Sequence, residues 1–190
     1  MPNRLIRNTA ILLKPEATYG VDPTPTGAAD ALVVSNLSIN PLNATQVDRD
    51  IIRSYLGAGE RLLGSRYVEM GFDLELTGAG TVAVAPAWGK SLLACAMAET
   101  ITATFRVDYT PVSSGMGSCA IYWYDDGLVH KALGVRGAPQ FKMGINQRPV
   151  ISYKFIGLYS TPTAASNPAT TLTAWKQPQL ISEANTMDVT

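Results

Sequence analysis

The residue types that most often carry out catalysis are few in this sequence and lie far apart along it. The 190 residues include one histidine, His130, and two cysteines, Cys95 and Cys119. His130 follows a turn signal, where a surface residue is expected, and the cysteines lack the spacing of a metal site. No basic residue next to Cys95 would activate its thiol. We therefore expect buried, unreactive thiols, no bound metal, no cofactor and no enzymatic activity.

Three acidic residues, Glu69, Asp73 and Glu75, occupy alternate positions of one short segment. Paired carboxylates can act as general acid and general base. The same alternation is typical of the solvated face of a β-strand, and no histidine or second cluster in the sequence completes a catalytic arrangement. We therefore interpret the three carboxylates as a strand face that is in contact with water.

Residues 78–83 match the G-x-G-x-x-A pattern of dinucleotide-binding loops. In such proteins the helix begins inside the motif, so that its N-terminus meets the pyrophosphate. Here Pro86 suits a first helical turn only several residues later. The preceding strand is amphipathic instead of uniformly apolar, so the pattern predicts a simple connecting loop.

Period-two alternation of apolar and polar residues is the main structural signal. It covers residues 67–77, with Val68, Met70, Phe72 and Leu74 among the apolar positions, and predicts a strand with one buried face. Further strands are expected at residues 101–109, 119–124, 128–133 and 150–159. Asp126-Gly127 predicts a tight hairpin between two of them. Apolar spacing after Pro86 predicts one helix over about residues 86–98.

These elements predict one mainly β domain, an antiparallel sandwich or barrel with a single flanking helix. Residues 1–45, rich in Pro and Gly, are expected to form an N-terminal arm with edge strands. Residues 46–66 are predicted to be a charged loop. Residues 67–159 form the core with its helix, and residues 160–190, broken by prolines, form a C-terminal arm.

Charge composition argues for association and against nucleic-acid binding. Fifteen basic residues balance fifteen acidic ones, and charged residues make up only 16% of the chain, against roughly 25% in typical proteins. Binding to nucleic-acid phosphates requires an excess of basic residues, and this sequence has none. A surface with few charges and no net charge favours contact with other subunits. The sequence has no stretch of 18 apolar residues, so we expect no membrane span.

Segments 4–14, 16–22, 47–57 and 85–100 together resemble the tail tube (major tail) proteins of long, flexible-tailed bacteriophages, over about residues 4–160. The resemblance implies six-membered rings of this chain that stack into a hollow tube and let genome DNA pass without sequence recognition. It also implies contacts with the tape measure, terminator and tail tip proteins. The protein would be assembled in the host cytoplasm, become part of the virion, and need no membrane anchor.

Within that resemblance, we expect the acidic residues Glu69, Asp73, Glu75 and Asp108 to line the lumen. Charged residues of the predicted loop and the N-terminal arm are expected to stack the rings, namely Arg4, Arg7, Arg49, Asp50 and Arg53. Two alternatives stay open. One is a tail terminator or neck ring, and the other is a β-sandwich binding module that uses the aromatic residues 122–124.

Overall fold

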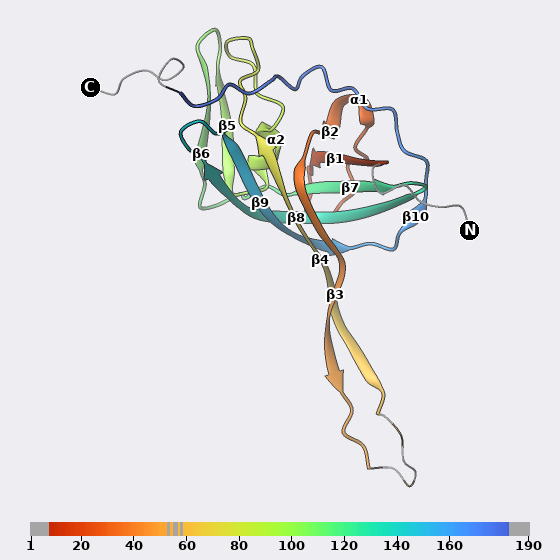
Figure 1. Cartoon of the computed structure of the whole chain (residues 1–190). Coiled ribbons are helices and arrows are strands. Elements are labelled where there is room, and N and C mark those ends of the chain that lie inside the picture. Colours follow the sequence, from red (N-terminus) through yellow and green to blue (C-terminus); the bar gives the residue numbers. More distant parts are fainter. Residues whose placement is uncertain (1–7, 53, 55–56, 58, 183–190) are drawn as a thin grey trace.

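An antiparallel sheet of eight strands dominates the computed structural model, which describes residues 8–52, 54, 57 and 59–182 (Figure 1). The strand order is β2-β1-β7-β8-β9-β4-β3, β10 also pairs with β8, and β5 and β6 form a separate two-stranded sheet. The predicted mainly β, antiparallel fold is confirmed. The elements in chain order are β1 (Thr9–Pro15), α1 (Gly27–Asp30), β2 (Ala31–Leu32), β3 (Ser35–Asp48), β4 (Arg61–Glu75), α2 (Gly89–Leu93), β5 (Met97–Thr102), β6 (Arg106–Pro111), β7 (Cys119–Asp125), β8 (Leu128–Lys142), β9 (Val150–Tyr159) and β10 (Thr163–Ala164).

The core lies on one face of this sheet and follows the predicted alternation of β4. Val68, Met70, Phe72 and Leu74 are all buried there. The Phe72 ring lies 5.8 Å and 5.4 Å, centre to centre, from two aromatic rings of the neighbouring strand β9. Burial of several large side chains is the main stabilising contribution expected in a domain of this size.

A tight turn at Asp126 and Gly127 joins β7 to β8, as the sequence predicted. Both residues have positive φ, 39° and 101°, which is the conformation of the two-residue turns that match the twist of a hairpin. Glycine reaches this region without steric cost, and aspartate tolerates it better than most residues. The turn fixes the register in which Tyr122 pairs with Lys131.

The predicted helix over residues 86–98 is much shorter in the structure. Helix α2 spans only Gly89–Leu93, and Ala96 adopts a positive φ of 56° that ends helical geometry. From Met97 onward the chain is strand β5, which pairs with β6. Cross-strand pairing therefore overrides the helix propensity of the alanines in this segment. The expected strand 101–109 likewise divides, because residues 103–105 form the turn between β5 and β6.

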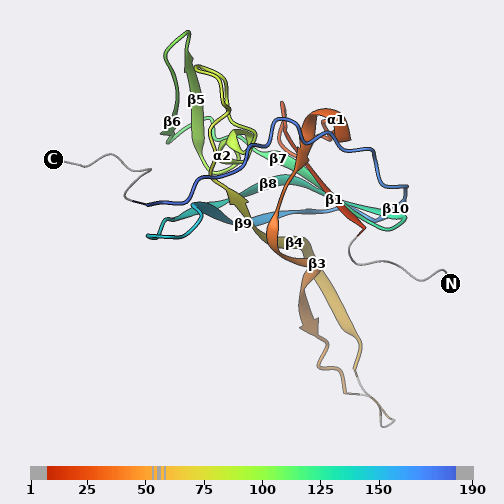
Figure 2. The same ribbon diagram turned by 45° about the horizontal axis from the view of Figure 1, so that its top comes forward.

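The segment predicted as a charged loop, residues 46–66, contains the ends of two long strands instead. β3 and β4 pair from Ser35 with Asp73 out to Asp48 with Arg61, and together they project far from the body (Figures 1 and 2). The predicted N-terminal arm is also more regular than expected. Strand β1 is not an edge strand, since it lies between β2 and β7.

The C-terminal arm crosses the molecule as an extended strap, defined here as residues 165–182 (Figure 2). The backbone N–H of Thr171 donates to the Gly27 carbonyl at 3.0 Å. The indole Nε1 of Trp175 donates to the Ala31 carbonyl at 3.0 Å. The strap therefore holds α1 and β2 against the rest of the fold.

Gly27→Ala is expected to loosen the strap, because a methyl group there would lie 2.3 Å from the backbone oxygen of Ala169. We expect a loss of about 1–3 kcal/mol in the free energy of unfolding and faster hydrogen exchange at the Thr171 amide. Denaturant unfolding and amide exchange measure both. Gly78→Ala is the matched control, since its nearest contact is 3.9 Å away. Unchanged Thr171 protection in Gly27→Ala would contradict this role.

Candidate functional site

The second face of the large sheet is uncovered over four strands. We call it the bare face, and it consists of the outward side of β3, β4, β9 and residues 136–142 of β8. Strand pairing sets its rows: Asn40, Glu69, Ile156 and Arg136 lie side by side in one row. A groove of about 480 Å³ crosses this face above Gly71, where no side chain fills the space.

Three of the four predicted lumen residues meet on the bare face. Glu69, Asp73 and Glu75 all project from β4 on this side, as the alternation predicted. Basic residues of the partner strands join them, since Lys154 pairs with Gly71 and Lys142 pairs with Val150, the residue opposite Glu75. The bare face is therefore mixed in charge, and not acidic as β4 alone suggested.

The acidic groups of this face have ordered partners. The Asn36 amide donates to Asp73 at 2.7 Å, and Arg148 forms a 2.6 Å ion pair with Glu75. Burial alone would raise the pKa of Asp73. The nearby Ser152 hydroxyl, the hydrogen bond from Asn36 and the cations Lys142 and Arg148 outweigh it, so the pKa of Asp73 lies below its usual value. Asp73 therefore stays charged at neutral pH.

Asp108, the fourth predicted lumen residue, lies elsewhere. It belongs to β6 in the separate two-stranded sheet and forms a 2.8 Å ion pair with Arg106 two residues away. The alternation of residues 101–109 does not identify the sheet to which they belong. The structure thus does not bring Asp108 to the bare face.

Residues 16–26 cover much of the remaining outward side, and Glu16 anchors this cover. Its carboxylate accepts hydrogen bonds from the Gly20 N–H at 2.8 Å, the Gly134 N–H at 2.7 Å and the Ser118 hydroxyl at 2.6 Å. The Tyr19 ring lies over Gly134 and beneath the Arg136 guanidinium. Sequence reasoning missed Glu16, because its partners are distant in the sequence.

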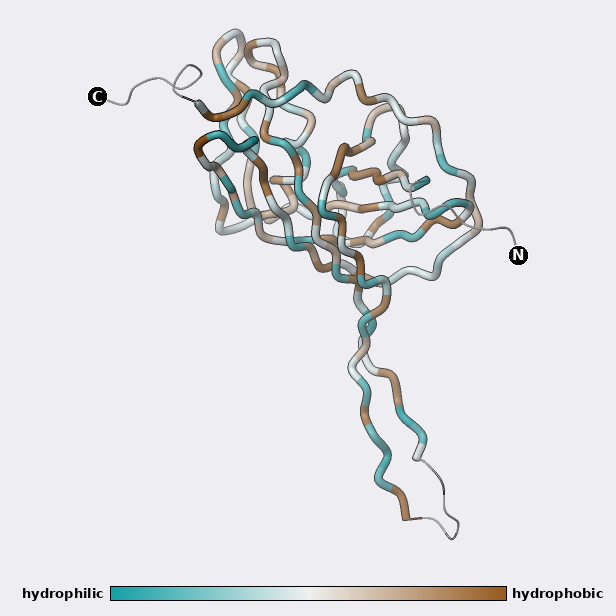
Figure 3. Tube along the Cα trace, viewed as in Figure 1, coloured by the Kyte–Doolittle hydropathy of each residue, from teal (hydrophilic) through white to brown (hydrophobic). Residues whose placement is uncertain are grey.

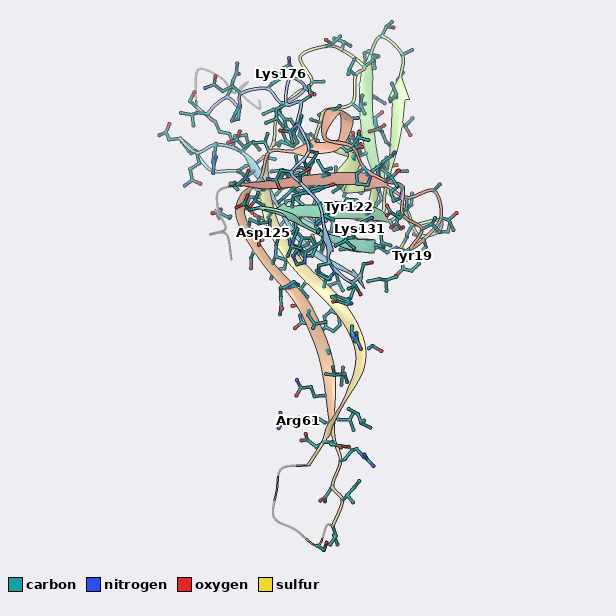
Figure 4. All side chains as sticks on the ribbon, turned by 90° about the vertical axis from the view of Figure 1, so that its right-hand side faces the viewer. Tyr19, Arg61, Tyr122, Asp125, Lys131 and Lys176 are labelled. Carbon is teal, nitrogen blue, oxygen red and sulfur yellow. The ribbon has the colours of Figure 1, made fainter. Side chains whose placement is uncertain are left out.

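A second anchor joins the same cover to β7 and β8 through Asp22. Its carboxylate accepts from the Tyr122 hydroxyl and forms a 3.0 Å ion pair with Lys131. Figure 4 shows Tyr122 and Lys131 next to each other on the body. Burial would raise the pKa of Asp22, but the hydrogen bonds from Tyr122, the Thr24 N–H and Lys131 bring it below the usual value. Burial, with the hydrogen bond to Asp22, raises the pKa of Tyr122 to about 12.

Two backbone edges border the bare face. β3 is the last strand of the sheet on one side. On the other side, β7 pairs with β8 only as far as Val135, so residues 136–142 have β9 as their only strand partner in the described part of the chain. The Gly137 N–H on this edge donates to the Ala94 carbonyl. Pro139, two residues on, faces the same edge without an N–H.

Beyond the sheet, β3 and β4 continue as a two-stranded ribbon, defined here as residues 44–48 and 61–66. Arg49 and Asp50, two predicted stacking residues, lie at its far end, where Arg49 forms a 2.9 Å ion pair with Glu60. Such exposed pairs contribute little stability. The other predicted stacking residues, Arg4, Arg7 and Arg53, lie outside the described residues.

The thiols and the histidine lie within the fold. Cys95 and Cys119 are buried and not disulfide-bonded, and burial raises the pKa of Cys95 to about 12 and that of Cys119 well above its usual value. His130 is half-buried and stacks on Trp123 with ring centres 4.7 Å apart. Among the described residues no group of three or more His, Cys, Asp or Glu could hold a metal ion. Over the same residues, no helix has the length and apolar character to span a membrane.

Comparison with known proteins gives one family. The profile described as phage tail tube protein matches residues 6–184. The fold also resembles two solved structures from the anti-feeding prophage. Its tube-terminating cap has a TM-score of 0.47 at 9% identity, with 87% of this chain and 93% of the cap covered. The baseplate of the same prophage has a TM-score of 0.42 at 8% identity, with 84% of this chain and 93% of the baseplate chain covered. No curated protein matches the chain.

Asp22→Asn is expected to lower the free energy of unfolding by about 1 kcal/mol at pH 7, because a charged acceptor is replaced in a partly exposed network. Since the pKa of Asp22 is lowered by folding, its contribution is present above the unfolded value of 3.8 and is lost as pH falls below it. The difference from wild type should therefore shrink at pH 3. Urea unfolding at both pH values measures this. Asp50→Asn, at the exposed far end of the ribbon, is the control, and a pH-independent difference for Asp22→Asn would contradict the prediction.

Proposed function

The chain belongs to the phage tail tube protein family, and from that premise we propose that its copies close into six-membered rings that stack into a hollow conduit for genome DNA. Membership makes the protein a structural component of the phage tail and therefore of the virion. Ring formation, stacking and DNA passage are the proposal. We further propose that assembly takes place in the host cytoplasm and that the tube ends contact the tape measure, terminator and tail tip proteins.

The observation that carries the proposal is a bare four-stranded face bordered by two edges that have no further strand partner among the described residues. A neighbour's β3 edge can pair with residues 136–142 of β8, and this contact joins two different surfaces of the chain. Contacts of this kind close into a ring when the rotation between neighbours permits. Closure also removes edges that otherwise invite uncontrolled pairing. Pro139 limits the hydrogen bonds that this edge can make, and so restricts its choice of partner.

Ring closure would turn the bare faces inward to line the lumen. Glu69, Asp73 and Glu75 oppose Lys142 and Lys154 on that face, together with Arg136. A lining with nearly balanced charge neither attracts phosphate strongly nor repels it strongly, so DNA could slide through without being held. The ribbon, with Arg49 and Asp50 at its far end, would project toward the next ring and stack upon it.

Electron microscopy of the purified protein over a concentration series tests this function. We expect hollow tubes with a regular axial repeat and six-fold end views. Single rings that never stack would instead favour a terminator or neck protein. Monomers at every concentration would contradict assembly and favour a binding module.

Glu69→Lys tests the lumen assignment, because Glu69 is exposed on the bare face and its replacement adds cationic rings along the channel. Tubes should assemble normally. Infectivity of phage carrying the change should fall about tenfold or more, since lysine would hold passing phosphates. Thr100→Lys, on exposed β5 of the separate sheet, is the control. Equal infectivity of the two variants, with normal tubes, would rule out a lumen position for Glu69.

A further inference from the structure

Exposed apolar side chains gather where β8 turns into β9. We call this cluster the apolar end, which consists of Phe141, Met143, Ile145 and Leu180. Met143 is 59% exposed and Ile145 is 82% exposed. Water contact for this much apolar surface is unfavourable, and exposed apolar side chains gathered at one end of a fold are typical of an interaction site. Figure 3 shows brown, hydrophobic stretches in this turn next to teal, hydrophilic ones.

The apolar end is held in place by the strap. The Asn146 N–H donates to the Ile181 carbonyl at 2.8 Å, and the Ile181 N–H donates to the Gln147 carbonyl at 3.2 Å. The Gln147 N–H in turn donates to Gly144 at 3.1 Å. The backbone beneath the exposed side chains is therefore already ordered, which lowers the entropic cost of binding a partner there.

The ribbon carries a second set of exposed apolar side chains. Val47 and Leu62, which pair across the strands, are each 53% exposed, and Leu63 is 57% exposed. The ribbon extends about 15 Å beyond Tyr67, the first residue of β4 that pairs with β9. A ribbon of two strands has no third strand or second layer against which to bury these residues, and such hairpins are marginally stable alone.

The ribbon and the apolar end lie at opposite ends of the same strands. β4 leaves the ribbon at Arg66 and reaches its far end at Glu75, which pairs with Val150 at the start of β9. The β8–β9 turn is at that far end, away from the projecting hairpin (Figure 1). One chain thus offers two apolar surfaces along the line of the bare face.

We propose that the apolar end of one copy receives the ribbon of a second copy of this chain in the adjacent ring. The inference rests on the proposed stacking of rings and names the acceptor surface for it. Two different surfaces on opposite ends of one subunit give an open-ended contact that repeats from ring to ring. The contact leaves nearby charges paired within their own copies: Asp48 with Arg61, Arg49 with Glu60 and Glu75 with Arg148.

The tip of the β5–β6 hairpin is the competing acceptor, since Phe105 is 66% exposed there. Its ring is already in contact with the Arg106 guanidinium at 5.3 Å. The hairpin also belongs to the separate sheet, outside the strands that continue into the ribbon. The apolar end is therefore the better match, and Phe105 serves as a comparison in the test.

The double variant Met143→Asn, Ile145→Asn is expected to form rings but to need a concentration about tenfold or more higher than wild type for tubes, because amides would be buried without partners. Val21→Asn is the control, since Val21 is a comparably exposed valine at 59%. Electron microscopy and sedimentation measure ring and tube content. Tube growth of the double variant at the wild-type concentration would overturn the proposal.

Cysteine cross-linking provides a test that keeps the full tube intact. A Leu62→Cys, Ile145→Cys chain, treated with copper-phenanthroline as oxidant, should form disulfides between copies and give a ladder of covalent multimers. Each single variant should give none, and the buried native cysteines should not react. Tubes that give no ladder, or a ladder only from Leu62→Cys, Phe105→Cys, would overturn this acceptor alone. Absence of tubes from the wild-type protein would overturn the proposed function as well.

Discussion

The Glu16 carboxylate determines where the sheet is covered and where it is bare. Its three hydrogen bonds draw residues 16–26 over β7 and the first half of β8 and end at Gly134. Gly134 has a positive φ of 57°, and the registers of β8 with both β7 and β9 shift around it. β8 exchanges its pairing with β7 for an open edge at this point. The bare face, its free edge and the proposed ring contact all begin there.

Short sequence patterns correctly predicted the parts of the fold that depend on residues close together in the chain. The alternation around Phe72 identified the buried face of β4, and Asp126-Gly127 identified a hairpin. The helix prediction failed beyond Leu93, because pairing between β5 and β6 competes with helix propensity and is not visible in a short window of sequence. The ribbon was missed for a related reason. Its strands mix polar and apolar residues without a clear alternation and include Gly64, and only their pairing makes them regular.

The candidate site was predicted in part, and the limit was the non-local pairing of strands. Alternation placed Glu69, Asp73 and Glu75 on one side of one strand. It could not show that β9 and β8 bring Lys154 and Lys142 to the same surface, and so it gave an acidic face where the structure has a mixed one. Nor could it assign Asp108 to a different sheet. Glu16 was missed as an anchor because its two most distant partners are more than 100 residues away.

The ribbon is narrower than the body from which it projects, and this difference has mechanical consequences for a stacked assembly. Bending stiffness falls steeply as the width and thickness of a beam decrease. The body has a broad sheet with a packed core, whereas the ribbon has two strands and no core of its own. If ribbons bridge successive rings, they act as compliant joints between stiff discs. Curvature of a long tail would then concentrate at the joints and leave the bore of each disc round.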